Sequence, residues 1–202
     1  MTTKIAILID GGYLRTAASS TYVYNPDFIE KVARRVVLPN ETLQRIFYYD
    51  CDPFNGEVKL PVSGELKKFE MRGWLDILAM KDLFAVSKGT LKFRGFKPKK
   101  IPVSSDTLTD ADFKPYFEQK GVDMRIGLDI ATLASSGRIE RIVLVTGDTD
   151  CVPAMKHGRI AGLQVAIVRF PGQSLSRELL WHADFCRSIE WPEDAEKFDK
   201  KT

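Results

Sequence analysis

The stretch that decides the fold runs from Arg141 to Val152, RIVLVTGDTDCV, where an apolar run breaks at a glycine and is followed by two aspartates one residue apart. The run has no polar alternation, which indicates a strand covered on both faces, as in a parallel sheet. Ligands of such sheets bind outside the carboxyl ends of the strands. The stretch therefore predicts that Asp148 and Asp150 lie at the carboxyl edge of a sheet, where active sites form.

Composition sets the class of protein. With 202 residues, 44% of them hydrophobic and 28% charged, the chain resembles a soluble globular protein that can bury a full core. No apolar run approaches the roughly 20 residues of a membrane span, so we expect a cytoplasmic protein without a membrane partner. Three cysteines and two histidines are too few and too scattered for a disulfide framework or a zinc site. Any metal would therefore be held by oxygen.

The first apolar run repeats the pattern of the central one. Lys4 to Ile9, KIAILI, ends at Asp10, and Gly11 and Gly12 then predict a turn. Aspartate before glycine is also ordinary turn chemistry, but two apolar strands that each end in aspartate favour a functional edge. Glycines there would let a substrate backbone approach the carboxylate. Neither a dinucleotide fingerprint nor a P-loop motif occurs in the chain.

Helices and strands are expected to alternate along the whole chain. The predicted helices are 25–39, begun by a capping Asn25 and Pro26, 63–83, 122–134, 153–161 and 176–183. The predicted strands are 4–9, 42–50, 141–146, 164–170 and 185–191. Alternation of this kind is typical of an α/β fold: a three-layer, doubly wound, mainly parallel sheet of Rossmann-like type in one domain, residues 1–191. A charged tail, 192–202, is expected to fray.

Two aromatic residues precede two further acids at the end of the strand 42–50. Alternation predicts that one of Tyr48 and Tyr49 points inward and the other outward. Asp50 and Asp52 could line the rim of a pocket, and a solvated loop before proline explains them at least as well.

Residues 81–118 are interpreted as a basic hairpin followed by a polar loop within the same domain. The hairpin is expected to turn at Lys88 and Gly89, and apolar and basic residues alternate from Leu91 to Arg94. A solvated edge strand protected by lysines would explain this pattern. A track for nucleic-acid phosphates would also explain why the cluster has one sign.

The helix 122–134 carries an acid on its buried face. Asp129 shares the stripe of Val122 and Ile126, where a carboxylate is costly unless it is paired, protonated or bound to a cation. Asp123, in the first turn, is explained by the helix dipole. On this ground Asp129 ranks above Asp123 as a functional residue.

The acids predict a metal site. Asp10, Asp148 and Asp150 reach one edge by strand topology, and Asp129 joins them if its helix leads back into the central strand. Carboxylates without histidine or cysteine suit Mg²⁺ or Mn²⁺, which can activate water against a phosphodiester. Asp150 could instead cap the helix that follows it.

Several motifs together resemble a known family. They are IDGGYL at 9–14, YYD at 48–50, KGVDMRIGLDIATLA at 120–134 and LVTGDTDCVPAMKHGRIAGLQVAIV at 144–168. The set is similar to the NYN domain, LabA-like branch, of the PIN-like nuclease superfamily. Tyr13 and Cys151 depart from the residues that many relatives carry, asparagine and an aromatic respectively.

The resemblance implies a PIN-like sheet and Mg²⁺- or Mn²⁺-dependent ribonuclease activity. It implies catalytic roles for Asp10, Asp129, Asp148 and Asp150, and a metal set that adds Asp123 to these four. We expect single-stranded or structured RNA as the partner, and a homodimer is one option for the assembly. The expected nucleic-acid-binding residues, chosen for their charge, are Lys92, Arg94, Lys97, Lys99, Lys120 and Arg169.

Two other functions remain open from the sequence. One is a non-catalytic RNA-binding or regulatory module, against which the intact acids argue. The other is a different carboxylate-metal phosphotransfer enzyme of Toprim-like type, which also places D-x-D after a strand.

Overall fold

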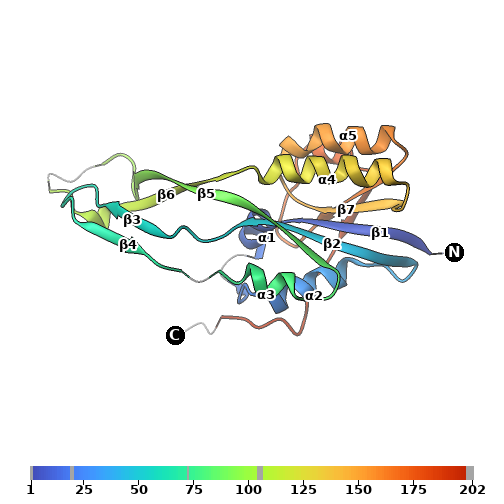
Figure 1. The fold of residues 1–202 in the computed structure, drawn as a ribbon, viewed down its shortest axis with the longest axis horizontal. Coiled ribbons are helices and arrows are strands. Elements are labelled where there is room, and N and C mark those ends of the chain that lie inside the picture. Colours follow the sequence, from blue (N-terminus) through green and yellow to red (C-terminus); the bar gives the residue numbers. More distant parts are fainter. Residues whose placement is uncertain (1, 19–20, 72, 104–106, 199–202) are drawn as a thin grey trace. The chain divides into compact units, whose positions relative to one another are not determined.

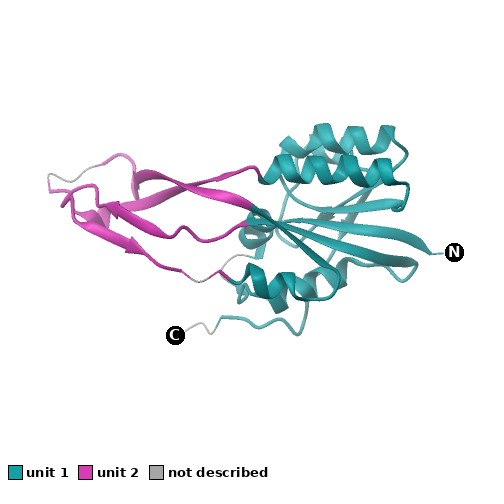
Figure 2. Ribbon diagram, in the orientation of Figure 1, with its two compact units in different colours: residues 1–50, 74–88, 122–202 teal, residues 51–73, 89–121 magenta. Residues whose placement is uncertain are grey.

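The computed structural model describes residues 2–18, 21–71, 73–103 and 107–198, and the chain divides into two compact units (Figure 2). Unit 1 comprises residues 1–50, 74–88 and 122–202, and unit 2 comprises residues 51–73 and 89–121. Within the described residues, none of the helices combines the length and the apolar character that a bilayer span requires.

Unit 1 is built on a parallel sheet. Its strands are β1 (Thr3–Asp10), β2 (Glu41–Cys51), β7 (Arg141–Val145), β8 (Gln164–Arg169) and β9 (Phe185–Ser188). They pair in parallel in the order β2-β1-β7-β8-β9, and β5 (Phe84–Pro98), whose first residues belong to unit 1, follows β2 in the sheet. The predicted mainly parallel α/β sheet is confirmed.

Helices cover both faces of this sheet. They are α1 (Gly11–Ala18), α2 (Pro26–Val36), α3 (Leu75–Ala79), α4 (Val122–Ser136), α5 (Val152–Ile160) and α6 (Arg177–Trp181). Figure 1 shows α4 and α5 on one face and α2 and α3 on the other. Along β1, Ile5, Ile7 and Ile9 pack into the core on the α1 and α2 side, and every residue from Ile5 to Ile9 is buried. Coverage of both faces explains why these strands lack polar alternation.

Local signals placed two helices correctly. Asn25 caps α2, because its side chain accepts a 2.8 Å hydrogen bond from the Phe28 amide, and the apolar Phe28, Val32 and Val36 of this helix are buried. Pro153 lies in the first turn of α5, and Gly162 follows its end with φ +89°.

The two glycines after Asp10 begin a helix instead of forming the predicted turn. A Cβ on Gly11 would overlap the Tyr48 hydroxyl and lie 2.6 Å from the Asp50 carboxylate. Gly11 therefore makes room for side chains of β2, and not for a substrate backbone. This close packing decides the residue type at position 11.

The predicted helix over 63–83 is wrong. Leu66–Phe69 forms strand β4, which pairs antiparallel with β3 (Gly56–Lys59), and only α3 is helical. Leu66 and Ile77, two apolar residues of this range, are exposed. Pairing with a partner strand outweighed a weak helical period that Gly73 already interrupts.

Unit 2 contains two antiparallel strand pairs, β3 with β4 and β5 with β6 (Phe113–Lys120). The expected turn at Lys88 and Gly89 is absent because β5 continues through both residues. The expected polar loop holds a short 3₁₀ helix, η2 (Asp110–Asp112), and residues 104–106 lie outside the described residues. Phenylalanine rings with centroids 5.3–6.0 Å apart form an aromatic cluster in this unit: Phe54, Phe69, Phe93, Phe96 and Phe117.

The charged tail is attached over most of its described length. The Phe198 amide donates to the Thr21 carbonyl at 3.1 Å, the Val23 amide donates to the Glu196 carbonyl at 2.9 Å, and Ala195 is buried. The expectation of fraying is therefore wrong for residues 192–198, and residues 199–202 lie outside the described part.

The glycine packing yields a stability prediction. Gly11→Ala should destabilise the protein by about 1–3 kcal/mol, because its methyl group would overlap buried polar side chains. Gly127→Ala is the matched control inside α4, where a Cβ would meet only Ala154 at 3.7 Å. This control should stabilise by up to about 1 kcal/mol through helix propensity. Urea unfolding measures both, and equal effects of the two substitutions would contradict the close-packing account.

Candidate metal centre

The carboxyl ends of β1 and β7 lie next to each other. Ile9 pairs with Val145 in parallel register, so Asp10 and Thr146 follow at neighbouring strand ends. The Thr146 hydroxyl donates to Asp10 at 3.4 Å, and the Asp148 amide donates to the Thr146 hydroxyl at 3.1 Å. The two apolar strands therefore bring their acids to one edge, as predicted from the sequence.

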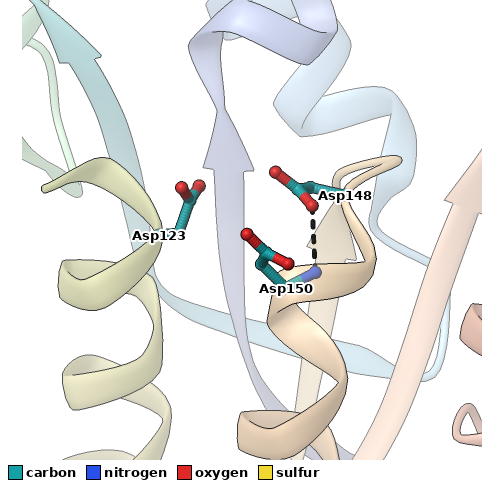
Figure 3. A group of neighbouring side chains, drawn as sticks. All are labelled: Asp123, Asp148 and Asp150. Carbon is teal, nitrogen blue, oxygen red and sulfur yellow. Dashed lines mark hydrogen bonds between the residues drawn. The ribbon is translucent and has the colours of Figure 1, made fainter. Parts of the chain in front are cut away.

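Three carboxylates gather at this edge (Figure 3). Asp123 in the first turn of α4, Asp148 after β7 and Asp150 in the 3₁₀ turn η3 (Thr149–Cys151) each offer one oxygen, and these oxygens lie within 4.8 Å of one another. We call these residues the acidic trio. Their separation suits oxygen ligands that share one cation.

Capping fixes the geometry of the loop that carries two of the trio. The Asp148 carboxylate accepts a 2.9 Å hydrogen bond from the Asp150 amide and so caps η3. The cap residue of α5 is Cys151, whose side chain makes no capping bond. Asp148 therefore supplies the local cap, and the capping role considered for Asp150 is not observed among the described residues.

The electrostatics of this edge favour a bound cation. Partial burial, together with the neighbouring Asp148 and Asp150 carboxylates, raises the pKa of Asp123. Burial also raises the pKa of Asp10, and the Asp123 carboxylate adds to this effect. A positive ion would remove this mutual repulsion.

A buried cysteine follows the two acids of the loop. Cys151 is 2% exposed, and burial raises the pKa of its thiol to about 12. The thiol is therefore neutral at neutral pH in the metal-free protein, and Cys151 is not a member of the acidic trio.

Asp10 and Asp129 lie outside the acidic trio. Asp10 is 9% exposed and accepts the Tyr13 amide at 3.1 Å. Asp129 lies about 9 Å farther along the α4 axis than Asp123 and accepts a 2.8 Å hydrogen bond from the Tyr49 hydroxyl. The structure thus brings Asp123, and not the higher-ranked Asp129, to the other acids, and it satisfies Asp129 with a neutral donor.

A buried network lies beside Gly11. Asp50 is 1% exposed, pairs with the Arg15 guanidinium and accepts the Tyr48 hydroxyl at 3.0 Å. The Tyr24 hydroxyl lies 2.8 Å from that of Tyr48. Asp50 is therefore neither at the rim of a pocket nor in a solvated loop. Asp52 belongs to unit 2.

Neither tyrosine of β2 points outward. Tyr48 and Tyr49 are both 0% exposed, because helices cover both faces of the sheet. The expectation of one inward and one outward ring is therefore wrong.

Tyr13 supports the loop that precedes Asp148. A Cβ on Gly147 would lie 2.6 Å from the Tyr13 ring, so the ring packs directly on this glycine. The Tyr13 hydroxyl is buried and has no hydrogen-bond partner among the described residues. In the sequence Tyr13 differs from the asparagine that many relatives carry, but no periodic pattern indicates its packing role.

The predicted basic residues fall in both units. Arg169 is exposed at the carboxyl end of β8 and donates to the Ser188 hydroxyl at 2.8 Å. The remaining predicted residues, all in the described part of unit 2, are Lys92, Arg94, Lys97, Lys99 and Lys120.

The mainly parallel sheet flanked by helices, with acids clustered at its carboxyl edge, is consistent with an α/β PIN-like fold. The model of the NYN domain matches residues 4–190, and the chain belongs to this family, whose members are generally nucleases. The match identifies the domain and does not resolve the LabA-like branch.

The fold is similar to that of a solved structure. This is the crystal structure of a Vibrio parahaemolyticus protein of unknown function, with a TM-score of 0.54 and 19% sequence identity. The similarity covers 98% of this chain and 97% of that one. The curated proteins compared with the chain contain no match.

The acidic trio predicts stabilisation by metal. Mn²⁺ at about 100 times its Kd should stabilise the wild-type protein by ~2.7 kcal/mol, seen as a rise in Tm. Asp148→Asn should lose most of this rise while keeping its fold in EDTA, because asparagine can still cap η3. Asp76→Asn, an exposed acid of α3, is the control. An unchanged metal response in Asp148→Asn would exclude the trio as the site.

The unpaired Tyr13 hydroxyl yields a second stability prediction. Tyr13→Phe should leave stability unchanged or raise it by about 1 kcal/mol, because it removes a buried polar group without a partner. Tyr48→Phe, which loses bonds to Asp50 and Tyr24, should destabilise by about 1–2 kcal/mol. Urea denaturation compares the pair, and a large loss in Tyr13→Phe would show that its hydroxyl has a partner.

Proposed function

We propose that this protein is an endoribonuclease that uses Mg²⁺ or Mn²⁺ held by its aspartates. The observation that carries the proposal is the acidic trio at the carboxyl edge of the sheet. Membership of the NYN family supports a nuclease, and nucleases of this family act on RNA.

The donor set fits a hard divalent cation. Asp123, Asp148 and Asp150 offer only carboxylate oxygens, and Asp10 stands at the adjoining strand end. A bound ion of this kind supplies an activated water and stabilises the departing oxygen of a phosphodiester. We assign the metal-holding role to the trio with Asp10 beside it.

The protein's own residues would orient this chemistry. The hydrogen bond from the Asp150 amide to Asp148 holds two carboxylates of the trio in one loop geometry. Asp129, anchored by Tyr49, acts in this proposal through the position of α4, which carries Asp123. Exposed basic residues would bind the phosphates, with Arg169 at the carboxyl end of β8.

The alternatives now have different weights. Family membership points away from a Toprim-like enzyme, because the same acids belong to a matched NYN domain. A non-catalytic RNA-binding module would have no need for three repelling carboxylates within 4.8 Å. The acids therefore favour catalysis over binding alone.

The proposal predicts metal-dependent cleavage of labelled single-stranded RNA. Asp148→Asn should lower the cleavage rate in Mn²⁺ by about 100-fold or more, since electrostatic groups at reacting phosphates typically contribute effects of this size. Asp123→Asn should lower the rate more than Asp129→Asn, because only Asp123 lies in the trio. Gel analysis of the products measures all three variants.

Two controls make the result specific. Asp76→Asn, purified in the same way, should cleave like the wild-type protein, and EDTA should stop both. Wild-type rates in a folded Asp148→Asn would show that the cleavage arises from a contaminating nuclease or from another site.

A further inference from the structure

The antiparallel pair β5–β6 has two chemically different faces. In its register Phe93 lies opposite Phe117, and Lys92 lies opposite Glu118. Since successive side chains of a strand alternate between faces, the phenylalanines share one face and the charged residues the other. The first face packs into the aromatic cluster of unit 2. The second, which we call the basic face, is left to solvent.

The basic face carries five cations, one acid and one aromatic ring. The bulge between Phe93 and Phe96 shifts the alternation by one residue, so Lys97 lies on the same face as Lys92 and Arg94. The members of the basic face in the described strands are Lys92, Arg94, Lys97, Lys114, Tyr116, Glu118 and Lys120. All five cations are exposed, and Tyr116 is 37% exposed. Glu118 pairs with Arg94 and Lys120, so it offsets part of the charge at one end of the face. The face keeps a positive excess, concentrated toward Lys97 and Lys114.

Protection of a sheet edge explains only part of this arrangement. β6 is the edge strand of its sheet, so Lys114 and Lys120 can guard its unpaired backbone groups, but this role does not require a lysine opposite Lys114 on β5. Lys97 and Lys114 lie directly opposite each other across the strands, and like charges in that position are destabilising. An anion bound at this face would remove the repulsion.

Tyr116 lies beside this pair of lysines. The Lys97 ammonium stands 3.3 Å from the centroid of the Tyr116 ring, which confirms that both side chains occupy the basic face. An exposed ring next to cations provides the two contacts that single-stranded nucleic acid needs, stacking for a base and charge for its phosphates.

We propose that the basic face of β5–β6 binds single-stranded RNA, with Tyr116 as the platform on which one base stacks and with Lys97 and Lys114 on the flanking phosphates. The choice of RNA rests on the proposed function. A base must be unstacked from its neighbours to reach the ring, so a duplex does not fit this platform. When a base binds, the flexible Lys97 side chain leaves the ring and contacts a phosphate.

The test measures binding without cleavage. A fluorescein-labelled, unstructured 12-nucleotide RNA is titrated in EDTA with protein that carries Asp148→Asn. Adding Tyr116→Ala should weaken binding about tenfold, within the range measured for stacked bases. Tyr116→Phe, which keeps the ring, should bind like the parent. Weakening of the same size on a duplex RNA would overturn the stacking role.

The lysine pair is tested by salt dependence. Lys97→Gln with Lys114→Gln should lower the affinity and reduce the slope of log K against log salt by about 1.4, as expected for two phosphates of a single strand. The matched control is Lys59→Gln with Lys68→Gln, which removes the same charge from the β3–β4 pair. Equal effects of the two double variants would show that binding depends on the general charge of unit 2 and not on this pair of lysines, and would overturn the proposal.

Two further outcomes separate this inference from the nuclease proposal. Loss of binding in Tyr116→Ala, in a protein that never cleaves RNA in Mn²⁺, would support the platform and reject the nuclease. Normal binding by Tyr116→Ala, in a protein whose cleavage depends on Asp148, would support the nuclease and reject the platform. Competition by poly-glutamate as effective as by RNA would assign the face to an acidic protein and overturn the proposal. Circular dichroism confirms that each variant is folded.

Discussion

The constraint on which the site depends is the parallel pairing of β1 with β7. Ile9 pairs with Val145, so β1 and β7 end at the same edge of the sheet, where Asp10 and Asp148 lie. Apolar burial on both faces holds these strands in place. Because the burial energy of the sheet fixes the edge, the protein can keep mutually repelling carboxylates there.

The strand β2 connects this edge to both helical layers. Tyr49 donates to Asp129 on α4, and Tyr48 donates to Asp50, which pairs with Arg15 on α1. Both rings are fully buried, and each hydroxyl has a partner. Adjacent residues of one strand thus fasten α4 and α1 to opposite faces, and the α4 contact holds the helix whose first turn carries Asp123.

Local patterns predicted the sheet well and the site in part. Apolar runs, caps and strand-end aspartates depend on neighbouring residues, so the edge and the helices begun by Asn25 and Pro153 were predictable. The functional ranking of Asp123 and Asp129 was not predictable, because a donor that is distant in the sequence, such as Tyr49, can remove the cost of a buried carboxylate. The same limit explains the false helix over 63–83, in which Leu66–Phe69 pairs with β3 and only Leu75–Ala79 is helical.

The division into units changes what the net charge means. An excess of +3 over the chain says little about a polyanionic partner. Unit 2, however, holds eleven basic and eight acidic residues, so the whole excess lies there and unit 1 is neutral. Salt screens charges beyond about 8–10 Å, so the charges of unit 2 act on a partner mainly at close range. The distribution therefore favours a defined binding surface in unit 2 over long-range steering by the whole protein.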